Sequence, residues 1–81
     1  MPSKPVYFTR HARQRMEDAK RGIVTDEEAI SVLNDPQVRY IGVYGKPNVL
    51  GDVNGKRLRI CFTEEENRLV VITVINRGAT A

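Results

Sequence analysis

The sequence contains few of the residues that form disulfides and metal sites. It has one cysteine, Cys61, and one histidine, His11. A single cysteine forms no internal disulfide, and one cysteine with one histidine cannot supply the ligands of a structural zinc site. A glycine-rich phosphate loop and an acidic metal-binding cluster are absent as well. We therefore expect no metal and no cofactor, and hydride transfer, nucleoside triphosphate hydrolysis and metal-dependent hydrolysis have no support.

Long apolar runs are also missing. The longest apolar stretch, residues 69–75, contains Thr73 and is far shorter than the roughly 20 residues of a membrane-spanning helix. Residues 1–5 contain no apolar segment of the length found in signal peptides. We expect neither membrane anchoring nor export, and we place the protein in the cytoplasm.

The chain length leaves room for one hydrophobic core. With 81 residues, we predict a single domain over residues 6–77 and flexible tails at residues 1–5 and 78–81. A domain of this size buries only about 60 to 65% of its unfolded surface, so we expect modest stability.

Charge is distributed unevenly along the chain. The formal net charge is only +3, but residues 1–22 carry +4, residues 23–36 carry −4 and residues 37–63 carry +4. The first and third of these segments are candidates for one shared basic face, which would suit a polyanion such as nucleic acid. The alternative is an ordinary solvated surface with scattered charge.

Residues 10–21 have the pattern of an amphipathic helix. Their apolar residues recur at spacings of three and four positions. Thr9 is suited to cap the start of this helix, and Gly22 is suited to end it. The preceding residues 6–8 form either a short extended segment or a hydrophobic staple.

A second, shorter helix is predicted directly afterwards. Thr25 and Glu28 fit a capping box, in which each side chain bonds the backbone amide of the other residue. Asn34, Asp35 and Pro36 end this helix. Two helices joined by so few residues form a hairpin, and their common apolar side requires a sheet to cover it.

The second half of the chain alternates apolar and polar residues as antiparallel strands do. The pair Asn54-Gly55 is a strong signal for a two-residue hairpin turn. Four strands are predicted, over residues 38–44, 49–53, 56–63 and 68–76. The expected fold class is therefore α+β, with two N-terminal helices packed on a four-stranded antiparallel sheet.

Thr73 is a polar residue within the apolar last strand. A three-residue loop over residues 65–67 would pair Glu64 with Arg68. Continued along both strands, this register places Arg59 opposite Thr73 on one face of the sheet. A four-residue loop would break this pairing, and Thr73 would then simply bond a neighbouring backbone group.

His11 is the candidate general base. It lies near the start of the first helix, where the helix dipole and the neighbouring arginines favour a neutral imidazole. A neutral histidine can take a proton from a hydroxyl group, which typically contributes about 100- to 10,000-fold to the rate. The alternative is a boundary histidine that packs beside Ala12.

Arg15 lies four residues after His11, so both project from the same side of the helix and could flank a phosphate. The alternative for Arg15 is an ion pair with Glu17 or Asp18. Arg13 lies on a different side of the helix and is more typical of a surface charge.

Arg57 and Arg59 alternate with apolar residues, so they point together away from the core. Their planar guanidinium groups are suited to clamp phosphate oxygens. The alternative is that they keep an edge strand soluble. Asn76 and Arg77 would extend such a site or form a polar exit from the last strand.

The tyrosines and the cysteine are weaker candidates. Tyr7, Tyr40 and Tyr44 could stack on bases, but we expect them mainly to pack in the core or at its rim. Cys61 falls beside Arg59 by alternation, while its chemistry favours burial. The sequence leaves open whether this thiol faces the core or a site.

Three segments of the chain resemble a known family. They are residues 8–16 (FTRHARQRM), residues 21–28, which contain RGI and TDEE, and residues 70–74 (VVITV). The chain is similar to small bacterial domains of unknown function with a His-Ala-x-x-Arg helix and a terminal Val-Ile-Thr-Val strand. That family is usually grouped with the RelE/ParE-like toxins, within the metal-independent ribonuclease folds that include barnase-like and colicin-like nucleases. The resemblance covers roughly residues 6–77 and implies two helices on a four-stranded antiparallel sheet.

The function that the resemblance implies is a metal-independent endoribonuclease of the toxin type. In this reaction the RNA 2′-hydroxyl attacks the adjacent phosphate and leaves a cyclic phosphate end. His11 would be the general base, Arg15 and Arg59 would stabilise charge on the phosphoryl oxygens, and Thr73 would orient one oxygen. Further phosphate or RNA contacts would come from Arg13, Arg57, Asn76 and Arg77.

Two alternatives stay open at this point. One is a non-catalytic module of the same fold that binds nucleic acid. The other is a protein-interaction domain, bound by an acidic partner like an antitoxin. Salt-sensitive binding without turnover would distinguish the first from an enzyme.

Overall fold

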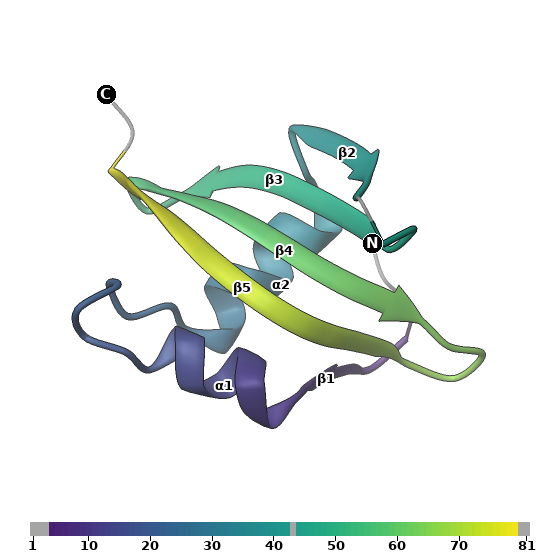
Figure 1. Ribbon diagram of the computed structural model, residues 1–81. Helices are drawn as coiled ribbons and strands as arrows, with labels where there is room; N and C mark the ends of the chain where they lie inside the picture. The colour runs from purple at the N-terminus through teal and green to yellow at the C-terminus, as the bar shows by residue number, and fades with distance from the viewer. Residues whose placement is uncertain (1–3, 43, 80–81) are drawn as a thin grey trace.

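The computed structural model of the chain describes residues 4–42 and 44–79. In this part of the chain, two short helices lie on one face of a five-stranded sheet (Figure 1). The order of strands across the sheet is β1-β5-β4-β3-β2. In chain order, the elements are β1 (Val6–Phe8), α1 (Arg10–Met16), α2 (Asp26–Asn34), β2 (Val38–Ile41), β3 (Pro47–Val53), β4 (Lys56–Glu64) and β5 (Leu69–Ala79).

The α+β class is confirmed, but the sheet is mixed and has one strand more than expected. Strand β1 pairs with β5 in parallel, with Val6 opposite Leu69. The backbone amide of Leu69 donates to the carbonyl of Pro5 (2.9 Å), and that of Thr9 donates to the carbonyl of Val71 (3.0 Å). Of the two predictions for residues 6–8, the extended segment is therefore the correct one. A strand this short is too brief to show a periodic pattern in the sequence.

Helix α1 is much shorter than predicted. It ends at Met16, with Glu17 as its C-terminal cap, whereas the sequence favoured a helix to residue 21. The backbone amide of Val24 bonds the carbonyl of Met16 (2.8 Å), so the chain folds back at that residue. Val24 is buried, while Ala19, which a longer helix would have carried, is exposed. Burial of an apolar residue here outweighs the helix propensity of the intervening segment.

The capping box of α2 is confirmed. The Thr25 hydroxyl accepts from the Glu28 amide (3.2 Å), and the Glu28 carboxylate accepts from the Thr25 amide (2.9 Å). The same carboxylate also accepts from Asn54 Nδ2 (2.8 Å) and Lys56 Nζ (2.8 Å). Glu28 therefore ties the start of α2 to the hairpin between β3 and β4.

The sheet has two different faces. Leu58 and Ile60 of β4 are fully buried and pack in one cluster with Ala12 and Met16 of α1. Side chains alternate along a strand, so Arg59 between them projects from the other face. We call this second face, which the helices do not cover, the open face.

The loop between β4 and β5 differs from the prediction. Glu64 pairs with Leu69, and the backbone amide of Glu65 donates to the carbonyl of Arg68 (2.8 Å). The loop therefore has four residues. The predicted three-residue loop required Asn67 in the left-handed region, but Asn54 is the one non-glycine residue with positive φ among those described.

The register beyond this loop was consequently predicted wrongly. The pairing shifts again between Cys61 and Phe62. As a result Thr73 lies opposite Cys61, and Arg59 lies opposite Ile75. Thr73 is still on the open face, but it faces Cys61, two residues along β4 from Arg59.

Element boundaries shift at two further places. Strand β2 ends at Ile41, so Tyr44 lies in the following loop instead of in a strand; Val43 is outside the described residues. Strand β5 extends to Ala79, three residues beyond its predicted end. No helix in residues 4–42 or 44–79 is long and apolar enough to cross a membrane.

Gly51 of β3 determines how closely α2 approaches the sheet. A Cβ atom at this position would lie 2.9 Å from Cγ1 and 3.3 Å from Cγ2 of Val32. We expect Gly51→Ala to lower the free energy of unfolding by about 1 to 3 kcal/mol through overpacking. Urea unfolding measures this change.

The double variant Gly51→Ala/Val32→Ala is the control, since it removes the methyl groups that the new Cβ would meet. Its destabilisation should be smaller than that of the two single variants added together. An unchanged or increased stability of Gly51→Ala would contradict the contact between α2 and β3.

Candidate functional site

Side chains from four strands line up in two rows across the open face. The pairing register sets the first row as Tyr40, Asn48, Cys61 and Thr73, from β2 to β5. The neighbouring row consists of Val38, Leu50, Arg59 and Ile75. The polar side chains of the first row therefore lie next to Arg59 in the second row.

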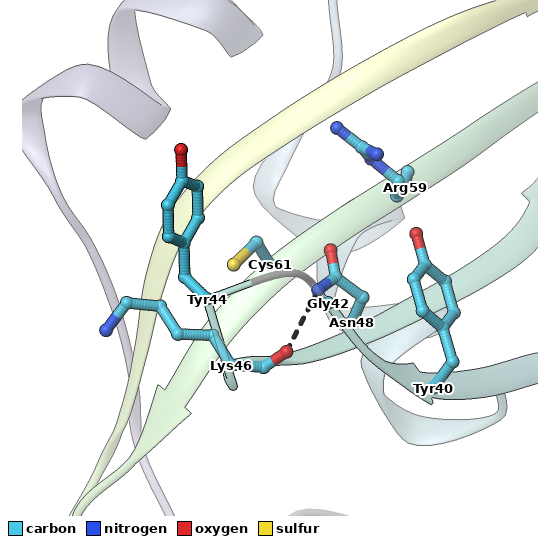
Figure 2. Close-up of a pocket in the computed structure, with 7 residues that line it drawn as sticks. All are labelled: Tyr40, Gly42, Tyr44, Lys46, Asn48, Arg59 and Cys61. Atoms are coloured by element: carbon cyan, nitrogen blue, oxygen red, sulfur yellow. Dashed lines mark hydrogen bonds between the residues drawn. The ribbon is translucent and has the colours of Figure 1, made fainter.

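A cavity of about 270 Å³ opens where the first row meets Arg59 (Figure 2). Its lining comes from β2, the loop after it, β3 and β4, and includes Tyr40, Gly42, Tyr44, Lys46, Asn48, Arg59 and Cys61. The side chain of Cys61 thus faces the site, which answers the question that the sequence left open. The cavity lies on the side of the sheet away from the helices, because Arg59 and Cys61 alternate with the core residues of β4.

Asn48 forms a buried, oriented part of the lining. It is only 6% exposed. Its Nδ2 atom donates to the backbone carbonyl of Lys46 (3.1 Å). That carbonyl also accepts from the Gly42 amide (2.8 Å), which closes the loop between β2 and β3. A Cβ atom on Gly42 would lie 2.6 Å from Asn48 Nδ2, so a glycine is needed for this approach.

Arg59 is one of two cations in the cavity lining, with Lys46. Its Nε atom is buried and has no hydrogen-bond partner among the residues that the structure describes. A buried N–H without an acceptor costs about 1 to 3 kcal/mol, and more when the group is charged. An anion bound in the cavity would supply that acceptor.

Arg57, the neighbouring arginine on the open face, already has an acidic partner. Its Nε donates to Asp52 Oδ1 (3.0 Å) across the hairpin. This hydrogen bond raises the pKa of Arg57 and lowers the pKa of Asp52. Arg57 is therefore already engaged, which leaves Arg59 as the better anion ligand.

Two tyrosines flank the cavity. Tyr44 is 89% exposed and Tyr40 is half-buried, and Figure 2 shows them on opposite sides of Asn48. We expected both mainly as packing residues, but Tyr44 packs in no core. Tyr7 lies elsewhere and is covered by the Arg68 guanidinium, 5.0 Å from its ring centre.

A family model matches residues 8–76. The chain belongs to DUF4258, a domain of unknown function. This confirms the predicted membership in a family of small domains of unknown function. No curated protein and no solved structure matches the chain. The whole cavity lining lies within the matched part of the DUF4258 domain.

The DUF4258 domain separates two residues that were predicted to act together. His11 is exposed on α1, and α1 packs against the face that Leu58 and Ile60 present. Arg59 projects from the opposite face. The imidazole and this guanidinium therefore do not face one site, although the prediction assigned both to the same phosphate. Arg15, half-buried on α1, lies on the helix side too.

Arg13 connects the two helices of the DUF4258 domain. Its guanidinium forms an ion pair with Asp26 at the start of α2 and lies 4.9 Å from the ring centre of Phe8. The hydrogen bond to Asp26 raises the pKa of Arg13. This ion pair agrees with the expectation that Arg13 is a surface charge and gives no support to its role as an RNA ligand.

The remaining predicted residues of the DUF4258 site are on β5. Asn76 pairs with Leu58, on the core side, and its amide would meet a Cβ on Gly22 at 2.5 Å. Asn76 also accepts from the Gly78 amide (2.9 Å). Arg77 is exposed. Thr73 lies directly opposite Cys61, which lines the cavity.

The cavity contains groups that can bind a ligand. Within the described lining there is no carboxylate and no histidine. No group of three or more metal-ligating side chains occurs in residues 4–42 and 44–79. The cavity combines an arginine, an oriented amide and two aromatic rings, which suit a planar, anionic ligand.

Sequence reasoning found Arg59 but not Asn48. Residues 45–48 lie between the predicted strands 38–44 and 49–53, whereas β3 begins at Pro47 and aligns Asn48 between Tyr40 and Cys61. A polar residue between Pro47 and Val49 was the only local signal, and it is weak without the register.

Proposed function

We propose that this DUF4258 domain binds single-stranded RNA through the open face. A phosphate would bind Arg59, and bases would stack on Tyr40 and Tyr44. The supporting observation is the buried Nε of Arg59, without a described partner, in a cavity between two tyrosines. Aromatic rings beside a cationic groove are the usual elements of single-strand recognition.

The charge of the open face agrees with this proposal. Lys46 and Arg59 contribute two positive charges to the lining, and Arg57 lies on the next row with Asp52. An acidic protein could also bind these cations. An acidic protein would not account for the exposed ring of Tyr44, whereas every nucleic-acid base offers a π-face that can stack on it.

RNA cleavage of the toxin type is the second part of the hypothesis and rests on the resemblance to RelE/ParE-like toxins. Strands β2 to β5 form antiparallel neighbours after two helices, which is the arrangement that the resemblance implies; β1 is an addition. The position of His11 on the helix side favours binding over this reaction, because general base and phosphate ligand must meet at one phosphate.

The decisive experiment is binding of a short fluorescent single-stranded RNA in EDTA at several salt concentrations. We expect Arg59→Ala to raise Kd by about tenfold or more, since it removes a charge-assisted hydrogen bond. The slope of log affinity against log salt should become shallower by about 0.7, the value for one phosphate contact on a single strand.

Arg21→Ala is the matched control. Arg21 pairs with Asp18 on the helix side (3.3 Å), so this variant removes the same charge far from the cavity. We expect its Kd to stay within about twofold of the wild type. Equal affinity of Arg59→Ala and wild type, or binding of acidic polypeptide but not RNA, would refute the proposal.

The RNA recovered from the same reactions tests cleavage. Intact RNA shows binding without turnover. Cleavage that disappears in His11→Ala would instead support the toxin-type ribonuclease, with expression arresting bacterial growth as a second readout.

A further inference from the structure

The cavity contains an acceptor that the RNA-binding proposal has not used. Asn48 is only 6% exposed. The hydrogen bond to Lys46 fixes the orientation of its amide, because a backbone carbonyl accepts and must therefore face Nδ2 and not Oδ1. The Oδ1 atom then lies on the other side of the amide. In Figure 2 this oxygen points away from the Lys46 carbonyl and lies between the rings of Tyr44 and Tyr40 in the view shown. No donor to Oδ1 is present in the described part of the chain.

We infer that the cavity is a subsite for one nucleotide and that Asn48 Oδ1 selects a base carrying an amino group. This inference rests on the proposed RNA binding. The base would lie against Tyr44 or Tyr40, its amino edge would donate to Asn48, and the attached phosphate would accept from Arg59. Each of these groups lines the same cavity.

The size of the cavity suits a single nucleotide. Its volume of about 270 Å³ is just below that of typical small-molecule pockets, roughly 300 to 1,000 Å³. Gly42 and Asn48 lie close together in the lining, since a methyl group on Gly42 would clash with the amide. Neighbouring nucleotides would lie outside, along the open face.

The direction of selectivity follows from the amide. Its Nδ2 group is bound to the Lys46 carbonyl and lies close against Gly42, so the amide meets a ligand through its acceptor, Oδ1. Cytosine presents an N4 amino donor at the position where uracil presents an O4 acceptor, and the two bases have nearly the same size. An acceptor facing O4 repels it and leaves Oδ1 buried without a partner. One such hydrogen bond corresponds to about a three- to tenfold difference in affinity.

The test compares oligocytidylate and oligouridylate of equal length, each titrated into the wild type and into Asn48→Ala. We expect the wild type to bind the cytidine oligomer about three- to tenfold more tightly. Asn48→Ala should bind both alike, because it removes the hydrogen bond to cytidine and the repulsion of uridine O4 together. Tyr44→Ala should weaken both oligomers by about tenfold through lost stacking and keep their ratio.

Unfolding of Asn48→Ala is monitored by circular dichroism. A second measurement needs no variant: the Asn48 side-chain amide signals in a ¹⁵N spectrum should shift with cytidine monophosphate more than with uridine monophosphate. If neither oligomer binds, the RNA proposal fails and the inference with it. If both bind equally to the wild type, or uridine binds more tightly, the inference alone is overturned.

Discussion

Glu28→Gln is expected to lower the free energy of unfolding by about 3 kcal/mol, at the lower end of the range for breaking a buried ion pair. The substitution preserves the size of the side chain but removes its charge. Lys56 Nζ would lose its ionic partner: of the two carboxylate contacts (2.8 and 2.9 Å), one would become a bond to a neutral amide oxygen and the other would face an NH₂ donor, while the Ile23 carbonyl (2.8 Å) stays. The side chain of Lys56 is 28% exposed, so water partly compensates and larger losses are not expected.

The same group makes stability depend on pH. Burial alone raises the pKa of Glu28, but hydrogen bonds from Lys56, the Thr25 amide and Asn54, together with the charge of Lys56, lower this pKa to about 2. Its ordinary value is 4.5. A pKa depressed by folding adds stability above the unfolded value, and this stability is lost as the pH falls from 4.5 toward 2. Urea unfolding over this range should show a decline that is reduced in Glu28→Gln.

Glu64→Gln is the control for both measurements. Glu64 pairs with Lys4, but its side chain is 60% exposed, and exposed ion pairs contribute about 0 to 1 kcal/mol. A loss in Glu64→Gln as large as that in Glu28→Gln would mean that the contacts of Glu28 with the hairpin do not stabilise the domain.

The parts of the fold that were predicted correctly depend on contacts between residues close in sequence. Thr25 and Glu28 cap α2 three positions apart, and Asn54-Gly55 forms the turn between β3 and β4. Each of these motifs satisfies its own hydrogen bonds locally. Such signals can be interpreted without knowledge of the remaining structure.

The errors concern contacts between distant residues. The end of α1 depends on Val24 packing into the core, and β1 exists only because β5 lies beside it. The shift between Cys61 and Phe62 depends on how β4 and β5 meet. No pattern within one segment encodes these pairings.

The site shows the same division. Alternation along β4 correctly predicted that Arg59 points away from the core. The spacing of His11 and Arg15 describes one side of a helix, but it cannot tell which face of the sheet the helix covers. Asn48 joins Tyr40 and Cys61 only through the pairing of three strands. A site built across strands therefore requires the register before it can be recognised.

Leu58→Ala is expected to have the largest effect on stability, about 2 to 5 kcal/mol. Leu58 is fully buried beneath the helices, so truncation removes apolar contacts and leaves a cavity. Native domains are stable by only about 5 to 15 kcal/mol, and a small domain has little reserve. Urea or thermal unfolding should show a strong loss, and the variant should still bind RNA where it is folded.

Leu50→Ala provides the matched control, because Leu50 belongs to the neighbouring strand and lies on the open face opposite Arg59. Leu50 is only partly buried, so we expect a loss of about 1 kcal/mol. Arg59→Ala should show the reverse pattern of Leu58→Ala, with RNA affinity reduced and stability largely retained. Equal destabilisation by the two leucine variants would contradict the division of the sheet into a covered face that holds the fold and an open face that binds.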